Sequence, residues 1–236
     1  MEREWLDELP ATDPGARGSR RDLKRLNSWM GHARIVEREL RPLAKSEGAV
    51  RVAELGAGDG DFLLRVARRL GGPWRGCAAT LVDRQKLVTE ETAGGFHELG
   101  WRIETRKEDV FDWCRDETAG HFDVVTVNLF LHHFDSEELQ KLFRAIEQRS
   151  AFFVAVEPRR SLLSLGFSHL LGFIGCNAVT RHDAPASVRA GFSGRELSRL
   201  WNGNGDCWIL REEPVGPFSH LFMARRRSAN HSPLSR

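Results

Sequence analysis

Apolar and polar positions alternate in a regular way along the middle of the chain. Five apolar runs are short enough to be strands, at residues 50–55, 77–82, 101–105, 122–127 and 151–156. Residues 62–70 and 135–149 follow two of these runs and carry apolar side chains at helical spacing. Strands that alternate with helices predict an α/β domain with a mostly parallel sheet.

The segments around this alternation have other patterns. Residues 1–20 hold prolines and glycines among polar residues, which predicts a mobile arm. Residues 21–48 carry an apolar helical stripe and predict a helix that covers the sheet. Residues 161–192 are predicted to form an insertion whose apolar first half packs on the domain or lines a pocket, with a role at a membrane surface as the alternative. The predicted domain spans 49–224, and a disordered basic tail is expected at 225–236.

Composition narrows the class of protein. The chain has 236 residues with 41% hydrophobic content, enough for one well-buried domain. Its formal net charge is +2 and its arginines are interleaved with acids, so composition gives no case for nucleic-acid binding. Four cysteines lie far apart without a C-x-x-C pair, and the sequence shows no secretory signal and no apolar run of membrane-spanning length. We therefore expect a cytoplasmic protein with reduced thiols and no stable membrane insertion.

A glycine turn follows the first predicted strand, at residues 54–61 (E-L-G-A-G-D-G-D). Gly56, Gly58 and Gly60 let the backbone turn tightly and approach a ligand closely. A dinucleotide site has the pattern G-x-G-x-x-G, whose third glycine would fall at Asp61. The acids of this turn repel a pyrophosphate but suit a ligand that carries a sulfonium and an ammonium group.

Further polar residues stand where other predicted strands end. Asp83 comes 29 residues after Glu54, at the end of the second strand, where a carboxylate binds the ribose hydroxyls of a nucleoside or caps the next helix. Asn128 ends the fourth strand, and His132 and His133 follow in the next loop. The carboxyl ends of parallel strands form the ligand crevice of such a sheet, so these side chains are expected at its mouth.

Three of these motifs, all in register, resemble those of class I S-adenosylmethionine-dependent methyltransferases. The stretch 54–60 resembles motif I, Asp83 matches the acid of motif II, and residues 122–134 (F-D-V-V-T-V-N-L-F-L-H-H-F) resemble motif IV and its following loop. The resemblance covers roughly residues 50–160. It implies a Rossmann-like, doubly wound, seven-stranded mostly parallel sheet with an antiparallel last strand, and S-adenosylmethionine as the cofactor.

Two outer segments resemble a narrower group. Residues 21–31 are similar to the leading helix of small-molecule methyltransferases of the type 11/12 kind, from a bacterial group often found beside polyketide or isoprenoid genes. Residues 181–189 resemble the R-H-D-x-x-x-S-V-R segment of the same group. The resemblance places acceptor-binding residues in the 161–192 insertion and implies a role in secondary metabolism.

The resemblance also assigns individual residues. The expected cofactor-binding residues are Glu54, Gly56, Ala57, Gly58, Gly60, Asp83, Arg84, Asp109, Val110 and Asn128. Asp109 would receive the adenine amino group and Val110 would lie against the ring, although the same two residues also suit an exposed turn. The expected acceptor-binding residues are Trp29, His133, Arg159 and His182.

His132 is the predicted general base. A histidine can deprotonate a phenol or an enolic carbon as it attacks the sulfonium methyl, although methyl transfer can also proceed by positioning alone. Asn128 is not followed by the Pro-Pro-aromatic turn of enzymes that methylate base nitrogens or glutamine amides, which favours a small-molecule acceptor. We expect methyl transfer to an oxygen or carbon of a small apolar, aromatic or polyketide-like acceptor, without a metal, by a monomer or homodimer.

Two other functions fit parts of the pattern. A nicotinamide-dependent oxidoreductase shares the fold, but the chain lacks its third glycine and has no tyrosine for a Tyr-x-x-x-Lys dyad. A non-catalytic S-adenosylmethionine-binding protein needs the glycine turn but no base.

Overall fold

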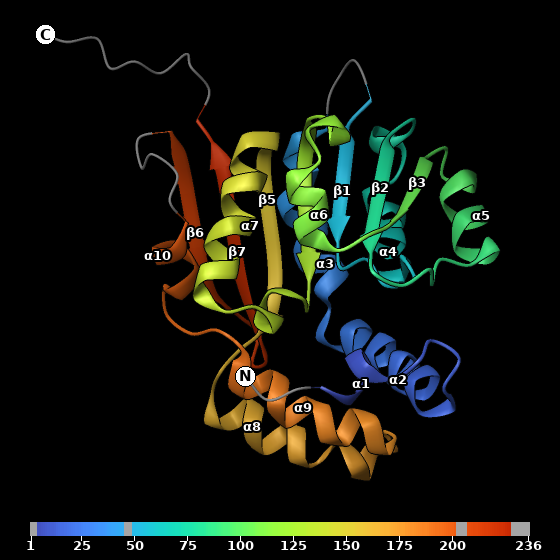
Figure 1. Cartoon of the computed structure of the whole chain (residues 1–236), viewed down its shortest axis with the longest axis vertical. Helices are drawn as coiled ribbons and strands as arrows, with labels where there is room; N and C mark the ends of the chain where they lie inside the picture. Colours follow the sequence, from blue (N-terminus) through green and yellow to red (C-terminus); the bar gives the residue numbers. More distant parts are fainter. Residues whose placement is uncertain (1–3, 45–48, 202–206, 228–236) are drawn as a thin grey trace, which may run out of the picture.

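A seven-stranded sheet runs through the molecule (Figure 1). The computed structural model describes residues 4–44, 49–201 and 207–227. The strands are β1 (Arg51–Leu55), β2 (Ala78–Asp83), β3 (Arg102–Lys107), β4 (Phe122–Asn128), β5 (Ser150–Pro158), β6 (Trp208–Val215) and β7 (Ser219–Arg226). Their order is β3-β2-β1-β4-β5-β7-β6, and the pairs are parallel except those that β7 makes with β5 and β6. The predicted Rossmann-like α/β fold with its antiparallel last strand is confirmed.

Helices cover both faces of the sheet, and each face has its own hydrophobic core. One core lies under α3 (His32–Leu40), α4 (Asp61–Leu70) and α5 (Glu90–Glu98), and the other under α6 (Val110–Arg115), α7 (Ser136–Arg149) and α10 (Glu196–Leu200). Neighbouring strand residues alternate between the cores, since Val52 and Val124 belong to the first and Ala53 and Val125 to the second. Short 3-10 turns complete the chain: η1 (Arg41–Leu43), η2 (Gly72–Trp74), η3 (Glu117–Ala119), η4 (Leu131–His133) and η5 (Leu171–Ile174).

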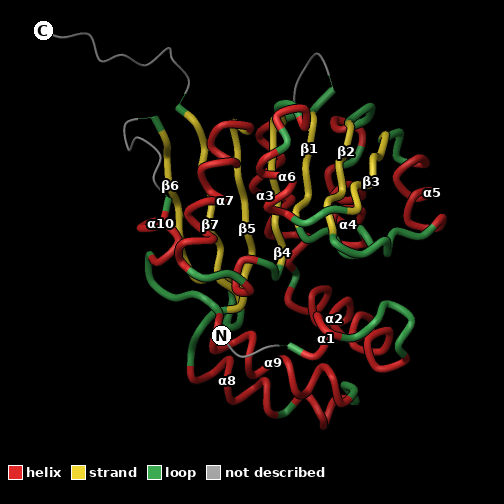
Figure 2. The backbone as a smooth tube through the Cα atoms, viewed as in Figure 1, coloured by secondary structure: helices red, strands yellow, loops and turns green. Residues whose placement is uncertain are grey.

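Four further helices form a layer beyond the carboxyl ends of the parallel strands (Figures 1 and 2). This cap layer consists of α1 (Trp5–Glu8), α2 (Pro14–Met30), α8 (Leu162–His169) and α9 (Ala178–Ala190). Buried polar contacts join α2 to the start of α9. The backbone N–H of Asn177 donates to Oδ2 of Asp22 at 2.7 Å, and Oγ1 of Thr180 donates to Oγ of Ser19 at 3.0 Å. The cap layer therefore brings residues 5–30 and 162–190, which are far apart along the chain, together beyond one edge of the sheet.

The N-terminal region is more helical than the sequence predicted. Within the arm expected at residues 1–20, α1 begins at Trp5 and α2 already begins at Pro14. Asp13 starts α2 because its side chain accepts the N–H of Ala16 at 2.9 Å and proline suits the first helical position. The single helix expected over 21–48 is divided at Gly31, whose φ of 71° ends α2 before α3 begins.

The later segments also differ from the expectation. The 161–192 insertion forms α8, η5 and α9, and His182 lies within α9. β7 continues to Arg226, past the expected start of the tail at residue 225, and residues 228–236 lie outside the described part of the chain. Among the described helices, none combines the length and the apolar character that crossing a bilayer requires.

Candidate active site

A cavity of about 1010 Å³ lies between the carboxyl ends of the central strands and the cap layer. Its floor is the glycine turn after β1 with the loops after β2 and β4, and side chains of α2, α8 and α9 close it from the cap. Nine of the ten predicted cofactor residues line it: Glu54, Gly56, Ala57, Gly58, Asp83, Arg84, Asp109, Val110 and Asn128. Gly60 does not, because it starts α4 and packs against Leu81, which a Cβ would approach to 2.9 Å.

The glycine turn and the loop after β2 are tied together by Asp83. Its Oδ2 accepts the N–H of Gly58 at 2.8 Å, and its Oδ1 accepts the N–H of Gln85 at 2.8 Å. Gly56 has a φ of 67°, and a Cβ there would lie 2.4 Å from the ring of Phe130. Glycine at position 56 thus permits both the turn and its close contact with the loop after β4.

The acids of the turn have different partners. Asp59 pairs with Lys24 of α2 at 2.5 Å, and Asp61 pairs with Arg65 at 2.7 Å. Glu54 is only 1% exposed, and its Oε2 has no hydrogen-bond partner among the described residues. Burial and the charges of the nearby turn acids raise the pKa of this carboxyl well above its usual value. A buried carboxylate without a partner at the cavity wall is suited to a cationic ligand group.

The other predicted cofactor residues are held by local contacts. Asp109 caps α6 by accepting the N–H of Phe111 at 2.8 Å, and Val110 is buried beside it. Oδ1 of Asn128 contacts Nδ1 of His32 at 2.8 Å, and Nε2 of His32 contacts Oγ of Ser219 at 2.8 Å. Burial lowers the pKa of His32 to about 4, so this histidine is neutral at neutral pH. His32 was not a predicted site residue.

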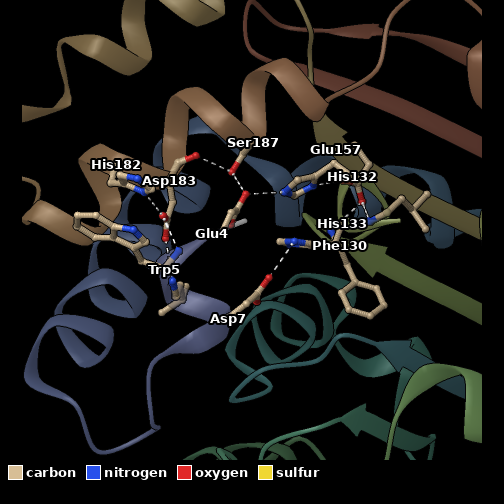
Figure 3. Close-up of polar contacts among 12 residues, drawn as sticks. Glu4, Trp5, Asp7, Phe130, His132, His133, Glu157, His182, Asp183 and Ser187 are labelled. Carbon is tan, nitrogen blue, oxygen red and sulfur yellow. Dashed lines mark hydrogen bonds and ion pairs between the residues drawn. The ribbon is translucent and has the colours of Figure 1, made fainter. Parts of the chain in front are cut away.

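His132 and Glu157 form a buried pair at the carboxyl ends of β4 and β5 (Figure 3). Nδ1 of His132 donates to Oε2 of Glu157 at 2.8 Å. Oε1 of Glu157 accepts the N–H groups of Phe130 and Leu131 at 3.0 and 2.9 Å, which fixes the carboxylate against the loop that carries the histidine. Glu157 was not a predicted site residue, and its position directly after the apolar run at 151–156 was the available signal for a role in the site.

Residues 4–8, called the arm, reach this pair from the opposite side (Figure 3). Oε1 of Glu4 lies 3.5 Å from Nε2 of His132, and Oδ2 of Asp7 lies 3.2 Å from Nδ1 of His133. Burial lowers the pKa of His132, but hydrogen bonds and charges from Glu157 and Glu4 outweigh it and raise the pKa to about 9. His132 is therefore an imidazolium at neutral pH while the arm is in this position.

The four predicted acceptor residues have separate positions. His133 lines the cavity. Trp29 is 62% exposed and stacks on Phe167, with ring centroids 5.3 Å apart, on the outer side of the cavity wall. Arg159 makes backbone contacts with Phe192 and Phe218 and does not line the cavity. His182 stacks on Trp5 and also lies outside the lining.

The arm completes a cluster that the sequence did not predict. One ligand atom from each of Glu4, His132 and His133 lies within 4.8 Å of the others, a spacing at which a metal ion can bind. The sequence predicted no metal, because Glu4 is far from the histidines along the chain. In the structure the carboxylate of Glu4 contacts Nε2 of His132 directly, as an ion pair.

Comparison with known proteins agrees with this geometry. Residues 52–149 match the family described as a methyltransferase domain. The structure of the plantazolicin methyltransferase BpumL in complex with SAH is similar, with a TM-score of 0.64 and 12% identity over 92% of each chain. An O-methyltransferase family protein from Burkholderia thailandensis has a TM-score of 0.55 and 18% identity over 94% of this chain and 65% of its own. Magnesium protoporphyrin IX methyltransferase (ChlM) from Synechocystis PCC 6803 with bound SAH has a TM-score of 0.56 and 14% identity over 94% of this chain and 91% of its own. A search of curated protein sequences gave no match.

Proposed function

We propose that this chain is a class I S-adenosylmethionine-dependent methyltransferase that transfers the methyl group to a hydroxyl oxygen of a small apolar acceptor, a proposal supported by the match to a methyltransferase domain and by the fold. The proposal rests on the buried pair of Glu157 and His132. Nε2 of His132, the ring nitrogen that does not contact Glu157, faces the cavity. A base at this position suits an acceptor that must lose a proton as it is methylated.

The residues at the glycine turn fit S-adenosylmethionine. The unpartnered carboxylate of Glu54 is placed to bind its ammonium group, and the anchored carboxylate of Asp83 to accept its ribose hydroxyls. Asp109 and Val110 are proposed to hold the adenine ring at the far end of the same wall. When bound, the cofactor supplies an electrophilic methyl group on a sulfonium, and the protein must orient the acceptor toward it and remove the acceptor's proton.

Replacement of Glu54 by glutamine should weaken cofactor binding and reduce the pH dependence of stability. We expect affinity for S-adenosylmethionine to fall about tenfold or more, because a hydrogen bond to a charged group contributes ~1.5–3 kcal/mol. The stability of the ligand-free protein should depend less on pH. Since the pKa of Glu54 is raised by folding, its contribution is present at low pH and is lost as pH rises through the folded value. Calorimetric titration and urea unfolding at several pH values measure both effects. Glu98→Gln, exposed on α5, is the control, and equal affinity in both variants would contradict this role for Glu54.

Proton removal follows from the tautomer of His132. The bond from its Nδ1–H to Glu157 leaves Nε2 to accept a proton from the acceptor, provided that Nε2 is neutral. Glu157 then faces the imidazolium that forms and stabilises its charge, while the N–H groups of Phe130 and Leu131 keep the carboxylate in place.

The rest of the cavity favours an apolar acceptor. Side chains from the cap layer and the turn before β7 form an apolar wall, namely Met30, Phe167, Leu171 and Phe218. The rings of Phe167 and Phe218 stack at 4.6 Å between centroids, and such a wall is suited to an aromatic or polyketide-like molecule. This fits a role in the modification of small metabolites.

Titration calorimetry tests the cofactor assignment first. We expect the protein to bind S-adenosylhomocysteine and not NADH, and Asp83→Ala to weaken this binding by about tenfold or more. Asp112→Ala, which removes an exposed carboxylate paired with Arg115, is the matched control and should bind like the wild type. Apolar phenols are then screened for methylated products by mass spectrometry. Binding of NADH alone would replace the proposal with an oxidoreductase.

A further inference from the structure

The arm is held by a specific dock on α9. Oδ1 and Oδ2 of Asp183 accept the N–H groups of Trp5 and Leu6 at 2.9 and 3.0 Å. The Trp5 ring stacks on His182 with centroids 3.7 Å apart and an interplanar angle of 11°. Asp183 is only 4% exposed, so its carboxylate is buried beneath the arm. These contacts fix where the arm lies relative to the cavity (Figure 3).

The contacts with α9 place the carboxylate of Glu4 between Ser187 and His132. Oγ of Ser187 donates to Oε1 of Glu4, and the same oxygen lies 3.5 Å from Nε2 of His132. Both Glu4 and Ser187 line the cavity. An acceptor oxygen must come within hydrogen-bond reach of Nε2 to give up its proton. Glu4 therefore occupies the position that the acceptor oxygen needs.

The charge of Glu4 also conflicts with the role of His132 as a base. With Glu157 from β5 on one side and Glu4 from the arm on the other, the pKa of His132 is about 9, and the protonated ring has no lone pair to offer. His133 from the same turn is the other titratable group that faces the ring, with centroids 4.2 Å apart. Departure of Glu4 removes one of the two carboxylates that raise the pKa of His132 and frees Nε2 for the acceptor.

We propose that Glu4 is a stand-in for the acceptor, and that a phenolic or enolic hydroxyl replaces its carboxylate between Nε2 of His132 and Oγ of Ser187 when the arm moves aside. Ser187, the serine of the segment at residues 181–189, then becomes an acceptor-binding residue, although it was not among the predicted acceptor residues. This inference rests on the proposed function, because it takes His132 as the base.

With the acceptor hydroxyl in the place of the Glu4 carboxylate, one proton and one methyl group are transferred. The acceptor's hydroxyl proton passes to Nε2 of His132, and the oxygen forms its bond to the methyl carbon. The carbon–sulfur bond breaks with its electron pair going to sulfur, which gives S-adenosylhomocysteine. Ser187 has one hydrogen to donate and also lies 3.2 Å from the carbonyl oxygen of Asp183, so its hydroxyl can turn from Glu4 to the acceptor oxygen.

The arm is built so that it can leave. α1 has four residues and none of them is buried. Besides the Trp5 ring stack, polar contacts hold it, through Asp183, Ser187 and the two histidines. Segments with few buried apolar contacts open at low free-energy cost. A ligand that makes its own bonds to His132 and Ser187 can therefore displace the arm.

Binding of 1-naphthol, an apolar aromatic hydroxyl, to protein saturated with S-adenosylhomocysteine tests the inference without turnover. We expect Glu4→Gln to bind 1-naphthol about tenfold more tightly than the wild type, because the competing carboxylate charge is gone. Ser187→Ala should bind it about tenfold more weakly while its affinity for S-adenosylhomocysteine stays unchanged. NMR titration of the His132 ring should show a lower pKa in Glu4→Gln. Asp7→Asn, on the same arm but paired with His133, should lower the pKa of His132 less than Glu4→Gln does.

The outcomes separate this inference from the proposed function. If S-adenosylhomocysteine does not bind, the proposed function fails. If it binds, but 1-naphthol binds equally well to the wild type, Glu4→Gln and Ser187→Ala, the stand-in role of Glu4 fails alone. A Glu4→Gln variant that binds 1-naphthol more weakly would instead make Glu4 part of the acceptor site, and would also overturn the inference.

Discussion

Glu157→Gln should lower the rate of methyl transfer about a hundredfold or more without loss of cofactor binding. In the wild type, Oε1 of Glu157 accepts two backbone N–H groups, and Oε2 accepts the Nδ1–H of His132. A glutamine keeps its carbonyl oxygen on the backbone N–H groups, so its NH₂ group faces Nδ1. The ring must then accept at Nδ1 and carry its proton on Nε2, where it cannot act as a base. Single-turnover rates with a phenolic acceptor measure the loss.

The chain contains a matched control for this substitution. Glu212 of β6 is fully buried, accepts the N–H groups of Leu197 and Ser198 at 3.0 and 2.7 Å, and contacts Nε2 of His220 at 2.9 Å. Like Glu157, it accepts two backbone N–H groups and contacts a histidine ring, but neither it nor His220 lines the cavity. Glu212→Gln should cost similar stability and leave the methylation rate unchanged. If both variants lose activity in parallel with their melting temperature, Glu157 acts through stability alone.

His132→Ala should lower the rate by a similar factor, because the proton acceptor is removed while the cofactor wall is left intact. Added imidazole should restore part of the rate, since the deletion leaves space beside the cavity where a free base can bind. His97→Ala, exposed on α5, serves as the control for loss of a histidine. Methylation by His132→Ala at the wild-type rate would show that positioning alone is sufficient for transfer.

The same substitution has a defined effect on the pH dependence of stability. Folding raises the pKa of His132 to about 9, above the ordinary value of about 6.5. The contribution of the protonated ring is therefore fully present below pH ~6.5 and is lost as pH rises through about 9. Urea unfolding on either side of this window should show a decline in the wild type that is reduced in His132→Ala. An identical decline in both would place the titrating group elsewhere.

The cofactor wall could be predicted from the sequence because its parts are local. Glu54, Asp83 and Asn128 each lie at the carboxyl end of a strand, and parallel strands that are neighbours in a sheet bring these ends together. The glycine turn needs positive φ at Gly56 and Gly58, which glycine adopts without strain. Strand periodicity and turn chemistry are properties of a few consecutive residues, so they can be read from the sequence alone.

The base and its surroundings were decided by tertiary structure. His132 was predicted, but Glu157, which orients it, lies 25 positions away along the chain, and Ser187 lies 183 positions from Glu4. No local pattern encodes these pairs, because they depend on how β5 lies beside β4 and how α9 lies beside the arm. The sequence by itself determined the fold class and the glycine turn, and it predicted His132 as the base. Only the folded chain determined the protonation of that base, since the charges that raise its pKa come from segments that packing brings together.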